Sequence, residues 1–194
     1  MLLNRLFLIF KVETSTRLNI PKIAALDTRK TTPGLRHLQK WAVTLGGGTN
    51  HRQSLKDGVL IKDNHLALLK SQGVSVEKAC HLAKKHAPRH LKVCVETDTL
   101  AQVREAIHGK ADIILLDNMS PQKAKKAIQL IEGRALVEIS GGITMKNIHS
   151  FGKIGADFIS IGALTHSASA KDLSMKMAVA SDHHSHRSKY RLHG

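Results

Sequence analysis

Short apolar segments alternate with polar, helix-forming segments through the middle of this chain of 194 residues. The apolar segments are rich in branched side chains and predict six strands, at Ile23–Leu26, Val59–Ile61, Val93–Val95, Ile113–Leu116, Leu136–Ile139 and Phe158–Ile161. Between several of them the apolar residues have helical spacing, as in Ala124, Ala127, Ile128 and Ile131. Continuous apolar strands separated by helices indicate a parallel sheet covered on both faces. Six such units suit either a barrel or a doubly wound sheet.

Polar or glycine residues follow the carboxyl end of every predicted strand. In chain order they are Asp27, Arg29 and Lys30, then Lys62 and Asp63, Glu96, Asp117, Ser140–Gly142, and Gly162. Ligands bind at this edge of parallel α/β folds because the loops there are free to vary. A doubly wound sheet would need such residues only near its switch point. Their presence after all six strands therefore favours a barrel-like arrangement around one central site.

The formal net charge of +15 is large for a chain of this length, and most of it lies within residues 23–180. Nucleic acid and a small polyanionic substrate are the two partners that such a charge suggests. Aromatic residues make up only 3% of the chain, which leaves little for stacking against bases. No zinc-finger, helix-turn-helix or RRM signature is present either. These observations therefore favour a small polyanion over nucleic acid as the partner.

The length suits one domain with a sizeable core. We divide the chain into a leader (residues 1–22), a catalytic α/β barrel (23–180) and a basic, His-containing tail (181–194) that we expect to be disordered. Two cysteines, Cys80 and Cys94, cannot form a disulfide framework and suggest a reducing, cytoplasmic setting. The apolar patch at residues 6–10 is too short to span a membrane and lacks a cleavage site, so we expect neither a membrane span nor a signal peptide.

Each candidate site residue has a structural alternative. The glycines of Ser140–Gly142 and Ile161–Ala163 could serve only as turns, but as a pair on the last two strands they match a phosphate site built from backbone N–H groups. Glu96 and Asp117 could be helix caps. Two carboxylates facing one centre among many cations more plausibly hold Mg²⁺ through oxygen.

The basic residues have the same two interpretations. Most lysines and arginines are solvated, yet the clustering of Arg29, Lys30, Arg52 and Lys62 near strand ends favours an anion pocket. His51 is equally consistent with a structural loop residue and with a donor to a carboxylate or a ring nitrogen. The roles of His65 and His166 stay open at this point.

Seven motifs together resemble one enzyme family, quinolinate phosphoribosyltransferase. In chain order they are DTRKTTPGLR from Asp27, GGGTNHR from Gly46, LIKDNH from Leu60, the stretch Val95–Leu100, ILLDNM from Ile114, EISGGIT from Glu138 and ISIGALTHS from Ile159. The resemblance covers residues 23–177. It implies an open, TIM-like α/β barrel of the phosphoribosyltransferase type that uses phosphoribosyl pyrophosphate and Mg²⁺. The implied products are nicotinate mononucleotide, pyrophosphate and CO₂, a step of NAD synthesis.

The resemblance also implies roles for individual residues. The quinolinate dicarboxylate would be bound by Arg29, Lys30, His51, Arg52 and Lys62. The phosphoribosyl group and its phosphates would be held by Thr28, Lys30, Glu96, Asp117, Ser140, Gly141, Gly142, Ile161, Gly162, Ala163 and His166. Glu96 and Asp117 would meet Mg²⁺, directly or through water. One departure is Cys94, where the family has a second carboxylate that would share a strand face with Glu96.

A second departure concerns the start of the chain. The family carries an N-terminal α/β sandwich domain that, in the dimer, covers the neighbour's barrel mouth, and the sequence begins shortly before the first barrel strand. We therefore expect a homodimer or higher homo-oligomer, or a separate chain that supplies this domain. Two alternatives to the enzyme are a non-catalytic barrel that binds the phosphoribosyl donor or phosphate, and a related protein associated with molybdate transport. The full match to DTRKTTPGLR and NHR makes the second of these less favoured.

Overall fold

The computed structural model of the chain describes residues 23–144, 146–168, 172 and 174–177. The leader expected over residues 1–22 and the tail expected over 181–194 lie outside this part. Within it, no helix is long and apolar enough to cross a membrane.

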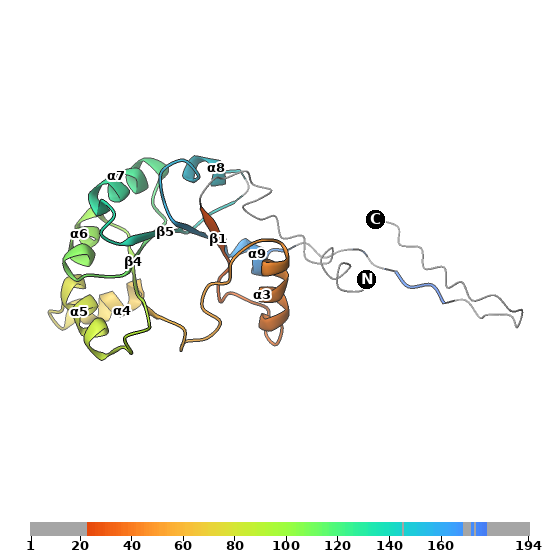
Figure 1. Cartoon of the computed structure of the whole chain (residues 1–194), viewed down its shortest axis with the longest axis horizontal. Coiled ribbons are helices and arrows are strands. Elements are labelled where there is room, and N and C mark those ends of the chain that lie inside the picture. The colour runs from red at the N-terminus through yellow and green to blue at the C-terminus, as the bar shows by residue number, and fades with distance from the viewer. Residues whose placement is uncertain (1–22, 145, 169–171, 173, 178–194) are drawn as a thin grey trace, which may run out of the picture.

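All six expected strands form, and every pair of neighbours is parallel. In spatial order they are β1 (Ala24–Leu26), β6 (Phe158–Ser160), β5 (Leu136–Ser140), β4 (Ile113–Asp117), β3 (Val93–Thr97) and β2 (Val59–Ile61). The sheet curves, but its two edge strands, β1 and β2, do not pair with each other in the described part (Figure 1). A single bridge joins Leu26 of β1 to Thr49. The open α/β barrel is therefore confirmed.

The helices lie on the outer side of the curved sheet (Figure 1). Those described are α3 (Arg36–Leu45), α4 (Asp63–Ser71), α5 (Val76–His86), α6 (Leu100–His108), α7 (Pro121–Ile131), α8 (Ile148–Phe151) and α9 (Ala163–His166). The expectation that helices cover both faces of the sheet is wrong. The sheet curls, so its inner face encloses a space lined by its own side chains and loops, and only the outer face needs helices.

Strand β3 shows how alternation separates the two faces of the sheet. Val93 and Val95 are buried in the hydrophobic core together with residues of α5 and α6. Glu96 lines the inner space, and Cys94, two residues before it, shares its face. The strand extends two residues beyond the expected Val93–Val95, so Glu96 belongs to the strand and does not follow it.

Candidate active site

One cavity of about 960 Å³ opens at the carboxyl edge of the sheet. It is lined by almost all of the site residues expected from the sequence, namely Thr28, Arg29, Lys30, His51, Arg52, Lys62, Glu96, Asp117, Ser140, Gly141, Gly142, Gly162, Ala163 and His166. The exception is Ile161, whose side chain packs in the hydrophobic core and whose backbone N–H donates to the Leu26 carbonyl. The structure therefore brings the expected residues to one place.

Two arginines on one side of this cavity have buried nitrogen atoms without a partner. The Nε atoms of Arg29 and Arg52 make no hydrogen bond within the described residues, while Arg52 Nη1 donates to the Gly58 carbonyl at 3.0 Å. Burial lowers the pKa of Arg52, and the positive charge of Arg29 lowers it further. Two guanidinium groups that repel each other and keep free N–H groups could hold an anion, and a carboxylate would suit their geometry.

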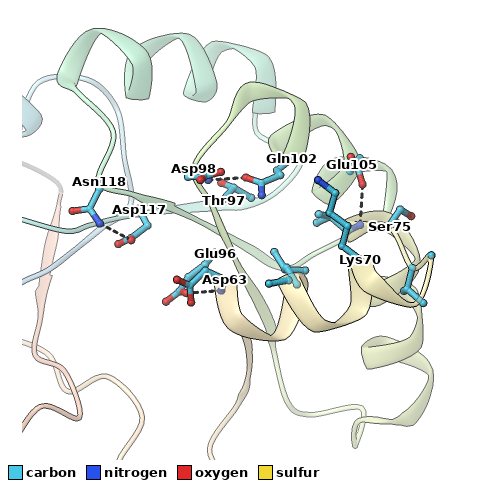
Figure 2. A pocket seen from close by; sticks show the side chains of 15 residues that line it. Asp63, Lys70, Ser75, Glu96, Thr97, Asp98, Gln102, Glu105, Asp117 and Asn118 are labelled. Carbon is cyan, nitrogen blue, oxygen red and sulfur yellow. Dashed lines mark hydrogen bonds between the residues drawn. The ribbon is translucent and has the colours of Figure 1, made fainter.

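Two carboxylates, Glu96 and Asp117, line the same cavity and a second one of about 770 Å³ beside it (Figure 2). Glu96 Oε2 accepts from the Asp63 N–H at 3.0 Å, and Asp117 Oδ2 accepts from the Asn118 side chain at 2.7 Å. Burial raises the pKa of Glu96, and the nearby charges of Asp117 and Asp63 raise it further against the opposing effect of Lys62. The pair is thus a local concentration of negative charge that a divalent cation would neutralise.

The glycine-containing loop after β5 contacts the loop after β4. Gly141 and Gly142 have φ values of +89° and +61°, and a Cβ on Gly141 would lie 2.2 Å from Asn118 Oδ1. Asn118 is itself in the left-handed region, with φ of +51°. Only glycine fits at position 141, because any side chain would displace Asn118 and with it the Asp117 carboxylate.

Gly141→Ala is expected to destabilise the protein by about 2–4 kcal/mol, since it combines positive φ with a steric overlap. Gly142→Ala is the matched control: it also has positive φ but no heavy atom within 4 Å of an added Cβ, so about 1 kcal/mol is expected. Denaturant unfolding of both variants measures the difference. Equal losses in the two variants would show that the overlap with Asn118 is relieved without cost.

A buried ion pair anchors the start of the loop that carries Arg29 and Lys30. Lys40 of α3 lies 2.5 Å from Asp27 Oδ1, and both side chains are almost fully buried. Burial raises the pKa of Asp27 against the opposing effects of Lys40 and of the His51 N–H, which donates to the same oxygen at 2.8 Å. Thr165 also donates its hydroxyl to the Lys30 carbonyl at 2.7 Å. These bonds fix the backbone from which the cavity cations project.

Lys40→Ala is expected to cost about 3–5 kcal/mol of unfolding free energy, because it leaves the Asp27 carboxylate buried without its counter-ion. The matched control is Lys84→Ala, whose partner Asp112 at 2.8 Å is partly exposed, so a loss of about 0–1 kcal/mol is expected. Urea unfolding of both variants compares them. A loss for Lys40→Ala no greater than that of the control would contradict a structural role for the pair.

His51 uses both ring nitrogens within the protein. Its Nδ1 accepts from the Arg52 backbone N–H at 2.8 Å, and its Nε2 lies 3.3 Å from Glu138 Oε2. In this conformation the ring has no free N–H for a ligand, which favours the structural alternative for this residue. His65 has a comparable local role, because its Nδ1 accepts from the Lys62 N–H at the start of α4.

Sequence reasoning missed three residues that shape the cavity. The expected site residues did not include Glu138, Asn118 or Lys40, the ion-pair partner of Asp27. Glu138 had a readable signal, since it is a charged residue inside an otherwise apolar strand, LVEIS. Lys40 had none, because nothing in the spacing of α3 marks it as buried.

The fold and the cavity define the class of this protein: an open parallel α/β barrel whose mouth combines an arginine pair, a carboxylate pair and glycine loops. Residues 11–176 match the family described as quinolinate phosphoribosyl transferase, C-terminal domain. The chain belongs to this family.

Curated relatives support the assignment. The chain is 42% identical over 161 residues to a probable nicotinate-nucleotide pyrophosphorylase [carboxylating] of Bacillus subtilis (strain 168), covering 83% of this chain and 54% of the relative. It is 43% identical over 155 residues to the protein of the same name from Methanocaldococcus jannaschii, covering 76% and 53%. The chain therefore spans about half the length of the curated relatives that it matches.

Solved structures of related proteins share the fold of this chain. The crystal structure of NadC from Streptococcus pyogenes superposes with a TM-score of 0.78 at 42% identity, covering 89% of this chain and 59% of that one. The nicotinate-nucleotide pyrophosphorylase from Francisella tularensis gives 0.74 at 40% identity, covering 87% and 57%. The open barrel is thus the fold of proteins that share about two fifths of the aligned sequence.

Proposed function

We propose that this chain is the catalytic barrel of a quinolinate phosphoribosyltransferase. It transfers the phosphoribosyl group of phosphoribosyl pyrophosphate to quinolinate with decarboxylation, giving nicotinate mononucleotide, CO₂ and pyrophosphate. The observation that carries the proposal is the pair of buried Nε atoms of Arg29 and Arg52, which have no partner among the described residues and lie in the same cavity as the carboxylates of Glu96 and Asp117. Such a cavity can hold a dianionic ring beside a group that becomes cationic. Membership of the family supports the same activity.

The cations would hold and orient the pyridine dicarboxylate. Arg29 and Arg52 offer fork-shaped donors that match carboxylates, and Lys62 adds a point charge at the start of α4. Lys30 lies beside Gly162 and would be shared between the ring and the phosphoribosyl group. Holding the ring nitrogen near the ribose carbon converts an encounter between two molecules into a step within one complex.

The carboxylates would stabilise the ribose as its bond to pyrophosphate breaks. Ribosyl transfer develops positive charge on the ribose ring, and Glu96 and Asp117 are fixed in place by hydrogen bonds before the reaction begins. Backbone N–H groups of the Ser140–Gly142 and Gly162–Ala163 segments would bind the phosphate. Once the ring nitrogen carries the ribose, the new pyridinium stabilises the charge left when CO₂ departs. The arginines then need only keep the ring aligned.

The donor set fits Mg²⁺ better than a tightly caged metal. No group of three or more His, Cys, Asp or Glu residues that could hold a metal occurs among the described residues. Mg²⁺ is typically held by one or two carboxylates together with substrate phosphates and water. Glu96 and Asp117 are suited to hold it in this way, and when bound it would neutralise charge on the leaving pyrophosphate.

Mg²⁺ binding in the presence of phosphoribosyl pyrophosphate is expected to weaken on acidification, beginning at a higher pH than an ordinary glutamate would give. The reason is the raised pKa of Glu96: Mg²⁺ needs the carboxylate, and protonation removes it as the pH falls through that pKa. Calorimetric titrations at closely spaced pH values measure the Mg²⁺ affinity. Glu96→Gln should remove the part of the pH dependence that comes from protonation of Glu96. A profile that is the same in wild type and Glu96→Gln would contradict the assignment of Glu96.

The turnover experiment tests the proposal. The purified chain is mixed with quinolinate, phosphoribosyl pyrophosphate and Mg²⁺, and nicotinate mononucleotide is followed by chromatography. Its formation, dependent on all three additions, supports the proposal. Saturable binding of the phosphoribosyl donor without turnover would support the alternative of a binding barrel that lacks turnover alone. Failure to bind either substrate would exclude both.

The setting of the enzyme is part of the proposal. We place it in the cytoplasm, consistent with two free cysteines, although a tobacco relative is named as mitochondrial. We also propose that it acts as a homodimer or higher homo-oligomer, or with a separate chain, as the resemblance to the family implies. Sedimentation velocity of the purified chain measures this, and a monomer that turns over would contradict it.

A further inference from the structure

Glu138 is a buried carboxylate inside the barrel that none of the steps above uses. It lies within β5, and its side chain is only 2% exposed. A carboxylate in such a place is costly unless its oxygens are paired. One oxygen accepts a hydrogen bond from the Ser160 hydroxyl of β6, and the other lies 3.3 Å from His51 Nε2. Because both carboxylate oxygens have a partner, the Glu138 side chain is held in one position.

The hydrogen bonds of His51 determine where its proton lies. The Arg52 backbone N–H donates to Nδ1 at 2.8 Å, so this nitrogen carries a lone pair and no proton. The single proton of the neutral ring is then on Nε2, where it donates to Glu138. The imidazole therefore bridges the carboxylate on β5 to the backbone of Arg52.

The His51 imidazole links a loop between the two edge strands, β1 and β2, to strand β5. The segment between Thr49 and β2 carries Arg52, and in the part of the chain that the structure describes its one strand pairing is the β-bridge of Thr49 to Leu26. Asp27 and Lys40 hold the backbone of His51, through its N–H at 2.8 Å and its carbonyl at 3.2 Å. Those two anchors belong to the β1 side. The ring of His51 is what ties the segment to β5, inside the barrel.

We propose that Glu138 is a positioning residue that acts through the Nε2–H of His51 to hold the Arg52 guanidinium ready for an anionic ligand. Fixing the ring fixes the Arg52 N–H that donates to it, and so the direction in which the Arg52 side chain leaves the backbone. Pre-ordering a donor in this way lowers the cost of binding its ligand. Only the identity of that ligand as a dicarboxylate rests on the proposed function.

The first test uses nitrogen-detected NMR of the ligand-free protein. Wild type is expected to show His51 protonated at Nε2 alone and a rigid Arg52 Nε–H. Glu138→Gln keeps an acceptor and should keep both signatures, whereas Glu138→Met, similar in volume but without an acceptor, should lose the fixed tautomer and mobilise the Arg52 signal. Asp157→Asn is the control, since its carboxylate also bonds to β5 but through the Val137 N–H near the start of that strand. A wild-type ring protonated at Nδ1, or an Arg52 signal unchanged in Glu138→Met, would overturn the proposal.

The second test measures quinolinate and phosphoribosyl pyrophosphate binding by calorimetry. Glu138→Met should weaken quinolinate binding by about tenfold, the scale of one hydrogen bond to a charged group, and leave the donor unchanged. His51→Leu should give a similar loss, and the double variant no further loss, because both act on one bridge. Two results would contradict the proposal that Glu138 acts through His51: additive losses of quinolinate affinity in the double variant, or a loss for Glu138→Gln as large as that for Glu138→Met. If wild type keeps the NMR signatures but binds no quinolinate, the proposed function fails and the positioning of Arg52 by Glu138 stands.

Discussion

Arg52→Ala is expected to weaken quinolinate binding by at least about 30-fold, the lower end of the loss when one partner of a buried charge pair is removed. Binding of phosphoribosyl pyrophosphate should change by less than about threefold, since the proposed roles assign Arg52 to the dicarboxylate and not to the phosphoribosyl donor. Within the described residues the Nε of Arg52 is buried without a partner, so the variant loses one hydrogen bond, from Nη1 to the Gly58 carbonyl, and the attraction of Glu138 and Asp57 for the guanidinium. Removal of its charge also relieves repulsion from Arg29. Calorimetric titration of each substrate measures the two affinities.

Arg89→Ala is the matched control, because Arg89 is exposed and does not line the cavity. It should leave both affinities unchanged. Thermal unfolding of the two variants separates binding from folding, and the loss of one partly buried hydrogen bond predicts a decrease in stability of about 1 kcal/mol for Arg52→Ala. An equal loss of both substrates in Arg52→Ala would refute the division of the cavity into a dicarboxylate side and a donor side.

Asp117→Asn is expected to lower turnover by about 10²–10³-fold, the range seen when a fixed group that stabilises developing charge is lost. The variant keeps the size of the side chain and its neighbour Asn118, so folding should be little affected. Quinolinate binding in the absence of the phosphoribosyl donor should be unchanged, because Asp117 lies among the donor-side residues. Steady-state rates of nicotinate mononucleotide formation at saturating substrates measure the effect.

Asp112→Asn provides the comparison from just before the start of β4, at the other end of the strand. Asp112 accepts from the Val93 N–H and from Lys84, so its replacement should lower stability while leaving turnover near the wild-type rate. If Asp117→Asn keeps more than about a tenth of the rate, the electrostatic role given to Asp117 is wrong.

The sheet and the location of the site follow from the sequence because parallel strands obey simple rules. The strands form nearly continuous apolar segments because helices cover their outer face and the barrel encloses their inner face, where Cys94 and Leu115 are buried. The carboxyl ends of parallel strands must also meet at one edge. The positions of Arg29, Lys62, Glu96 and Asp117 relative to the strand ends therefore predict that they line one cavity, as they do in the structure. The structure confirms the expected parallel arrangement of all six strands.

Helix α3 shows where such reasoning fails. Its buried side includes Gln39 and Lys40, whereas Leu38 and Trp41 are 48% and 37% exposed. An apolar pattern therefore does not mark the face that packs against the fold. Gln39 and Lys40 are buried beside Ala42 and Val43 because Lys40 pairs with Asp27 and Gln39 bonds to Thr32 and to the Thr165 carbonyl. These partners lie outside the helix, so the spacing within α3 does not reveal them.

The unpartnered state of the arginines likewise could not be read from the sequence. Clustering indicated an anion pocket, but most clustered arginines pair with protein carboxylates or with water. Only the structure shows that Arg29 and Arg52 keep buried Nε atoms without partners and that the ring of His51 is already used. These contacts favour the two arginines as the groups that would bind the dicarboxylate, and they favour a structural role for His51 beside Arg52.

A crystal structure of the chain with quinolinate tests the central claim most directly. The account predicts the dicarboxylate between Arg29 and Arg52, with a carboxylate oxygen within hydrogen-bond distance of each Nε, and His51 still bonded to Glu138. Quinolinate bound instead against Glu96 and Asp117, or outside the barrel mouth with both Nε atoms still unpaired, would contradict it.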